Sequence, residues 1–163
     1  MSEDASMHRE ALREAAMTVV AHLHGLRVNR LHLVAPETGH ELLDALRYGL
    51  DLERLDQERH FFQALKHVEV ALAGQVAVEH YLDTLPVAGE AETIAASILD
   101  HLCNSMRQQE ALRAFAHTRL LDLLDTPVHR EMIEELATQL EIEGELDRDQ
   151  FMLVTLRTVK LPI

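Results

Sequence analysis

Apolar residues recur every three or four positions along most of this chain, a spacing that places them on one face of an α-helix. The first such stretch predicts a helix over residues 6–33. Its apolar positions alternate steps of four and three: Leu12, Ala16, Val19, Leu23 and Leu26. That alternation is typical of a coiled-coil seam, along which one helix interlocks with another. The long seam therefore favours self-association of the chain as a homodimer.

Prolines and glycines divide the rest of the chain into further helical segments. Pro36 ends the first unit, because the residue before a proline avoids the helical conformation. The later predicted helices are a short one over 37–48 and long ones over 52–85, 90–124 and 127–143. The last of these has a good start signal, since the capping candidates Asp125 and Thr126 precede Pro127 at the first helical position.

The connections at 86–89 and 125–127 are short, which makes the helices that they join antiparallel neighbours. The predicted fold is therefore all-α, an up-down helical bundle of four long helices plus one short helix. A length of 163 residues indicates a single domain. Aromatic residues make up only 4% of the chain and tryptophan is absent, so the predicted core is aliphatic. The apolar tail, 151–163, is predicted to be either a last helical segment or an extended arm.

The net charge of −13 argues against binding to nucleic acid, whose phosphates require a basic surface. An anionic membrane surface is disfavoured for the same reason, whereas a basic protein partner is compatible. Cys103 is the only cysteine, so an internal disulfide is excluded. The polar N-terminal segment lacks the apolar core of a secretory signal, and no long apolar run predicts a membrane span. We therefore expect a cytoplasmic protein.

Several polar side chains fall on or beside the apolar faces of the predicted helices. Levelling the helices about their short turns brings three carboxylates to one height: Glu69, Glu110 and Glu143. Glu58 and His117 fall at a neighbouring level. Carboxylate and imidazole groups inside a helical bundle are the ligands of non-haem iron and manganese sites. These five residues form the predicted metal site, with iron or manganese as the cofactor.

A second interpretation gives the same residues no chemistry and the protein no cofactor. A buried charge needs a partner and often fixes the register of packed helices. Arg113 lies on the apolar side of its predicted helix and is placed to pair with Glu58 or with a glutamate of the predicted helix over 127–143. The repeated Glu-x-x-His pattern of di-iron bundles is also missing, because its only match, Glu37 to His40, stands at a helix start.

The sequence contains no P-loop and no Gly-x-Gly-x-x-Gly motif, so neither ATP nor a dinucleotide is expected as a cofactor. Whether the protein is an enzyme stays open. The first prediction is a non-enzymatic helical interaction protein, such as an adaptor, assembly factor or accessory chaperone, that acts through an apolar and acidic helical surface. The alternative is a metal-binding four-helix bundle, either an iron or manganese oxidoreductase or a storage protein.

Overall fold

The computed structural model describes residues 2–34, 36–85 and 89–159. Within these ranges the chain is mostly helical and contains one pair of short strands. The elements in chain order are α1 (Glu3–Leu23), β1 (Arg30–His32), α2 (Glu41–Tyr48), the 3₁₀ turn η1 (Leu52–Arg54), α3 (Phe61–Leu82), α4 (Glu90–Leu102), α5 (Met106–Asp125), α6 (Pro127–Glu143), β2 (Glu145–Asp147) and α7 (Arg148–Thr158). The all-α prediction is confirmed. The described residues form seven helices, however, in place of four long helices and one short helix.

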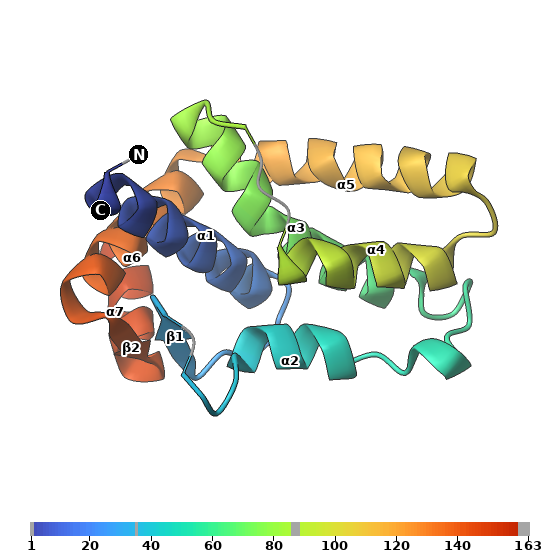
Figure 1. Ribbon diagram of the computed structural model, residues 1–163, viewed down its shortest axis with the longest axis horizontal. Helices are drawn as coiled ribbons and strands as arrows, with labels where there is room; N and C mark the ends of the chain where they lie inside the picture. Colours follow the sequence, from blue (N-terminus) through green and yellow to red (C-terminus); the bar gives the residue numbers. More distant parts are fainter. Residues whose placement is uncertain (1, 35, 86–88, 160–163) are drawn as a thin grey trace.

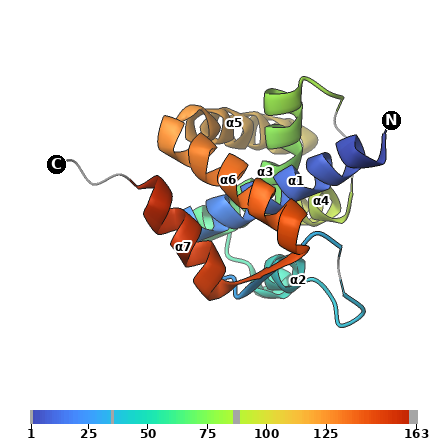
Figure 2. The ribbon, with the colours of Figure 1, turned by 90° about the vertical axis from the view of Figure 1, so that its left-hand side faces the viewer.

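Helix α3 carries more buried residues than any other described helix and packs against α1, α4 and α5 (Figure 1). Helix α1 also packs against α6, which crosses it in the view of Figure 2. Gly74 allows α3 and α1 to approach closely, because a Cβ atom there would lie 3.1 Å from the carbonyl oxygen of Arg13. The largest fully buried side chains are leucines, isoleucines and one aromatic residue, Phe151. The aliphatic core agrees with the prediction from composition.

The first three residues of the seam predicted on the first helix are buried inside the chain, whereas Leu23 is 39% exposed. Leu12 is 2% exposed, and Ala16 and Val19 are 0% exposed. They are covered because α1 packs against both α3 and α6. This part of the seam therefore belongs to the core of the chain and is not available for contact with a second copy.

The first helix ends at Leu23, well before the predicted residue 33. Gly25 adopts the left-handed φ of 80°, and the N–H of Leu26 donates to the carbonyl oxygen of Ala21 at 2.9 Å. This geometry is a usual helix end, because it satisfies a carbonyl group that the helix leaves free. The chain then extends into β1, which pairs with β2 in antiparallel register, with Leu31 opposite Leu146.

The predicted helix over 90–124 is two helices, α4 and α5. Cys103 has the extended dihedral angles φ −117° and ψ 149°, so α4 ends at Leu102. Ser105 then caps α5, because its side chain accepts a hydrogen bond from the N–H of Gln108. The apolar spacing continues across this break, so the hydrophobic period by itself predicts one helix.

The predicted helix over 52–85 begins late, at Phe61. The residues before it form η1 and a turn, in which the carboxylate of Asp56 accepts hydrogen bonds from the N–H groups of Glu58 and Arg59. Aspartate favours such local turns over a continuing helix. The short helix α2 starts at Glu41 rather than at residue 37, with His40 as its cap.

The C-terminal part of the chain folds back onto the helices. Helix α6 has the predicted bounds, 127–143, and Gly144 ends it with a φ of 75°. Asp147 and Gln150 form a capping box that starts α7. Of the two alternatives for the tail, the helix is correct through Thr158, and residues 160–163 lie outside the described part. Among the described helices, none combines the length and the hydrophobicity that crossing a bilayer requires.

Candidate functional site

The five predicted metal ligands lie in different environments. Glu69 is fully buried in α3 and His117 is half-buried on α5. The other three, Glu58 before α3, Glu110 on α5 and Glu143 at the end of α6, are exposed. Within the described ranges, no group of three or more His, Cys, Asp or Glu side chains could hold a metal ion.

The predicted heights of these ligands along the bundle require one straight helix over 90–124. The break at 103–105 makes α4 and α5 separate helices, each with its own packing partners. The heights assigned to Glu110 and His117 along the bundle are therefore not their heights in the fold.

Glu69 contacts two nitrogen-bearing side chains. Its Oε2 lies 2.7 Å from Nε2 of His24, which follows α1 directly, and its Oε1 lies 2.5 Å from Nε of Arg119 on α5. The Glu69 side chain is 0% exposed and that of Arg119 is 42% exposed. The contact joins three parts of the fold and balances the buried charge with a guanidinium group. The interpretation as a buried polar contact applies to Glu69, with Arg119 as its cationic partner. Arg113, the predicted partner of Glu58, is exposed.

His67 lies near this cluster and is 4% exposed. Its Nδ1–H donates to the carbonyl oxygen of Gln63, one helical turn earlier, at 2.9 Å. Burial disfavours a charge on the ring and the neighbouring His24 adds to this effect, so the pKa of His67 is lowered below its ordinary value.

Acid is expected to destabilise the protein through His67. As the pH falls below about 6.5, the unfolded state binds a proton at His67 before the folded state does, so the free energy of unfolding decreases by at most about 1.4 kcal/mol per pH unit. Urea denaturation at pH 7 and pH 5 should show a smaller loss in His67→Gln than in the wild type. His101→Gln is the matched control, because exposed His101 makes the same bond to a carbonyl oxygen four residues earlier. Equal losses in all three proteins would contradict this role.

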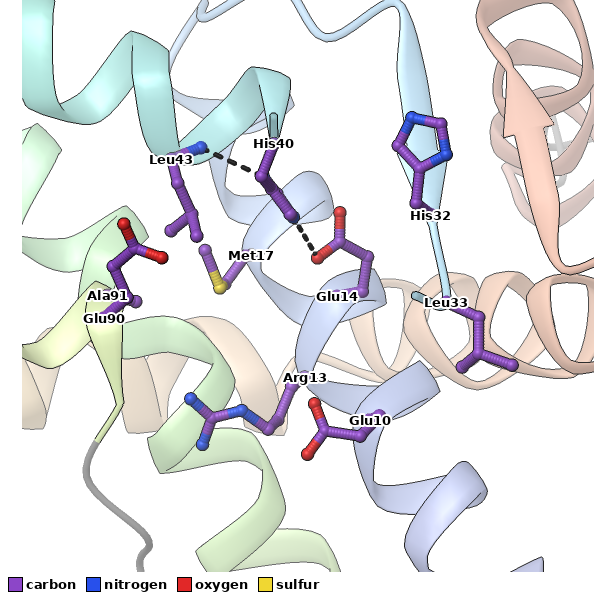
Figure 3. Close-up of a pocket in the computed structure, with 10 residues that line it drawn as sticks. All are labelled: Glu10, Arg13, Glu14, Met17, His32, Leu33, His40, Leu43, Glu90 and Ala91. Atoms are coloured by element: carbon purple, nitrogen blue, oxygen red, sulfur yellow. Dashed lines mark hydrogen bonds and ion pairs between the residues drawn. The ribbon is translucent and has the colours of Figure 1, made fainter. Parts of the chain in front are cut away.

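A cavity of about 170 Å³, which we call the polar cavity, opens between α1, α2, β1 and the start of α4 (Figure 3). Its charged and polar wall consists of Glu10, Arg13, Glu14, His32, His40 and Glu90. Its apolar wall includes Met17 and Leu43. Acidic and basic side chains from separate elements therefore face one small space.

Glu14 and His40 form a hydrogen-bonded pair at this cavity. Nδ1 of His40 accepts from the N–H of Leu43, so the proton of the neutral ring is on Nε2, which donates to Oε2 of Glu14 at 2.7 Å. Burial opposes a charge on His40, but the Glu14 carboxylate more than offsets it, so the pKa of His40 is raised above its ordinary value. The ring is thus held at both nitrogens.

Glu14 is not among the predicted site residues, although the sequence contains a signal for it. Glu14 is the only charged residue in the stretch 14–21, and it is buried together with the seven residues that follow it. A carboxylate at the start of such a run is a buried polar group, and a buried polar group needs a partner. That partner, His40, is supplied by a different element, which the spacing along α1 does not reveal.

An apolar groove of about 480 Å³ lies along the first half of α5. We call it the α5 groove. Its walls are formed mainly by Phe61 of α3, Leu102 and Cys103 at the end of α4, and Leu112 and Phe115 of α5. Large apolar side chains are well exposed on these elements: Phe62 is 72%, Met106 67% and Phe115 50% exposed. Exposed apolar patches of this kind are typical of protein-binding surfaces.

Two exposed residues of opposite charge are found at or next to the α5 groove. Glu58 lines the groove from the turn before α3, and Arg107 on α5 is the neighbour in sequence of the lining residue Gln108. None of the ion pairs among the described residues includes Glu58 or Arg107. Both charges are therefore available to a partner.

Comparison with known proteins gives no assignment for either cavity. No protein-family model matches the chain. No curated protein matches its sequence significantly.

Proposed function

We propose that the protein is a non-enzymatic helical interaction protein, of the adaptor, assembly-factor or accessory-chaperone kind, that acts in the cytoplasm. The observation that carries this proposal is the α5 groove, with Phe62, Met106 and Phe115 exposed on its elements. Exposed aromatic and methionine side chains are enriched at the centres of protein interfaces. Burying them against a partner removes apolar surface from water, which favours binding.

The proposed occupant of the α5 groove is a second copy of the chain. In a two-fold symmetric dimer the same surface is used by both copies, so it must complement itself. Two charges support this proposal: Glu58 lines the groove and Arg107 is next in sequence to the lining residue Gln108, and both are exposed and outside the ion pairs of the described residues. A two-fold axis at the groove pairs each Glu58 with Arg107 of the other copy. The homodimer proposal thus rests on α5 and no longer on the buried seam of α1.

Phe115→Ser is expected to weaken dimerisation by roughly 3–10-fold, because burying the exposed half of an aromatic ring at an interface contributes about 0.7–1.5 kcal/mol. Sedimentation velocity over a range of protein concentrations measures the monomer–dimer equilibrium. Leu156→Ser is the matched control, since Leu156 is 68% exposed on the distant helix α7. A wild-type protein that is monomeric at every concentration would show that self-association is wrong and would direct the search to a basic partner protein.

A charge exchange tests the pairing of Glu58 in one copy with Arg107 in the other. Arg107→Glu and Glu58→Arg should each weaken the dimer, because each places like charges opposite one another. The double variant should regain most of the wild-type affinity. Additive weakening in the double variant would show that Glu58 and Arg107 do not pair between the two copies.

The alternative function, a metal-binding bundle with iron or manganese, has no observation of similar weight. Glu69 is its only fully buried ligand candidate, and both carboxylate oxygens of Glu69 already contact nitrogen atoms of other side chains. Elemental analysis of protein purified without affinity metals tests it directly. Stoichiometric iron or manganese that is lost in Glu69→Ala would favour the bundle.

A further inference from the structure

The polar cavity contains a buried carboxylate oxygen without a partner. The Glu14 side chain is 10% exposed, and its Oε2 accepts from His40, but its Oε1 is buried and has no hydrogen-bond partner among the described residues. In Figure 3 this second oxygen is the one without a dashed line, and it lies on the side of the carboxylate that is nearer to His32. An unsatisfied buried oxygen on a charged group is costly, so a donor in the cavity would stabilise the protein.

The charges around the polar cavity favour a cation as that donor. Three carboxylates of the wall, Glu10, Glu14 and Glu90, face one guanidinium, that of Arg13. Two residues outside the wall pair with it: Glu92 with Arg13 at 2.9 Å, and Arg47 with Glu90. The negative charge of Glu92 and the positive charge of Arg47 cancel in the total. Counted over its carboxylates and its guanidinium alone, the wall has an excess of two negative charges.

The shape and chemistry of the wall favour an organic cation over a metal ion. Divalent metals need several converging oxygen or nitrogen ligands, and no such group exists within the described ranges. An ammonium group needs only acceptors for its N–H donors, and Glu14 Oε1 supplies a charged one. Met17 and Leu43 supply an apolar surface beside it for an alkyl stem. The volume of about 170 Å³ has room for several water-sized groups.

We propose that the polar cavity is a binding site for a primary alkylammonium group, with Glu14 Oε1 as its charged acceptor and Met17 and Leu43 against its alkyl stem. The ammonium group belongs either to a free small amine or to a lysine side chain of another protein. This site is separate from the α5 groove and does not depend on the proposed dimer.

Binding of n-butylammonium is measured by isothermal titration calorimetry, with nuclear magnetic resonance of the His40 ring protons as a local probe. Saturable binding with a shift at His40 is expected, and n-butanol, a neutral analogue, should bind at least roughly tenfold more weakly. Glu14→Gln keeps an acceptor for His40 but removes the charge, so it should weaken n-butylammonium binding by roughly 10–100-fold. Glu131→Gln, an exposed change on α6, is the matched control and should bind as the wild type does.

A second variant keeps the test valid if Glu14→Gln folds poorly. Leu43→Lys places a tethered ammonium group in the cavity, so it should abolish n-butylammonium binding while circular dichroism shows an intact helical fold. Equal affinity for n-butylammonium in the wild type, Glu14→Gln and Leu43→Lys would overturn the proposal. Tighter binding of Mg²⁺ or Zn²⁺ that displaces n-butylammonium would also overturn it, in favour of a metal site.

A lysine derivative distinguishes the two sources of the ammonium group. Nα-acetyl-lysine methylamide carries the same alkylammonium stem on a peptide backbone. If it binds as tightly as n-butylammonium and loses affinity in Glu14→Gln, the natural ligand is a protein lysine. If only n-butylammonium binds, the ligand is a free amine.

Discussion

Replacing Phe151 with alanine is expected to lower the free energy of unfolding by about 3–5 kcal/mol, because the change leaves a large cavity in the core. Phe151 lies on α7, is 1% exposed and makes an edge-to-face contact with the ring of His22, with the ring centroids 5.3 Å apart. Helix α7 also packs against α6, so Phe151 joins the C-terminal helix to the body of the protein. Urea denaturation followed by circular dichroism measures the change.

Leu153 provides the control for this prediction, because it lies on the same helix but is 57% exposed. Leu153→Ala should change the free energy of unfolding by less than about 0.5 kcal/mol. If Phe151→Ala and Leu153→Ala behaved alike, α7 would not be part of the cooperative core, and the tail would be better described as an extended arm.

Arg119→Met is expected to cost about 3 kcal/mol of stability, although Arg119 itself is 42% exposed. The cost comes from Glu69, which remains fully buried and keeps only His24 as a partner among the described residues. Glu69→Leu should cost less, because the guanidinium of Arg119 can turn into water and His24 can stay neutral. The double variant should therefore be more stable than Arg119→Met alone.

Arg54→Met is the control for this second prediction. Arg54 pairs with Asp51 across 3.7 Å, and both side chains are well exposed. An exposed pair of this kind contributes at most about 1 kcal/mol. A double-mutant cycle at Glu69 and Arg119 that gives a coupling near zero would show that the buried carboxylate does not depend on Arg119.

The candidate sites could be predicted from the sequence only in part. Glu69 was singled out as a polar residue on a helical face, and it is indeed buried. Its partners could not be named, because His24 and Arg119 lie 45 and 50 positions away along the chain, on other elements. Pairs of this kind are set by how helices pack, which a helical period does not contain. Three other residues assigned to the same metal site, Glu58, Glu110 and Glu143, are exposed, and the helical period does not contain this information either.

Local chemistry did determine much of the molecule. The helical spacing and the low aromatic content of 4% predict helices around an aliphatic core. The start signal at Pro127 and the glycine at 144 place both ends of α6 correctly. These features depend on residues within one or two turns, so the sequence contains them completely. Gly25 is a local signal of the same kind for the end of α1, but only the tertiary structure decided that the next segment pairs as a strand with β2. It alone also brought Glu14 to His40 and left the first half of α5 exposed, since burial and pairing depend on neighbours that are distant in the chain.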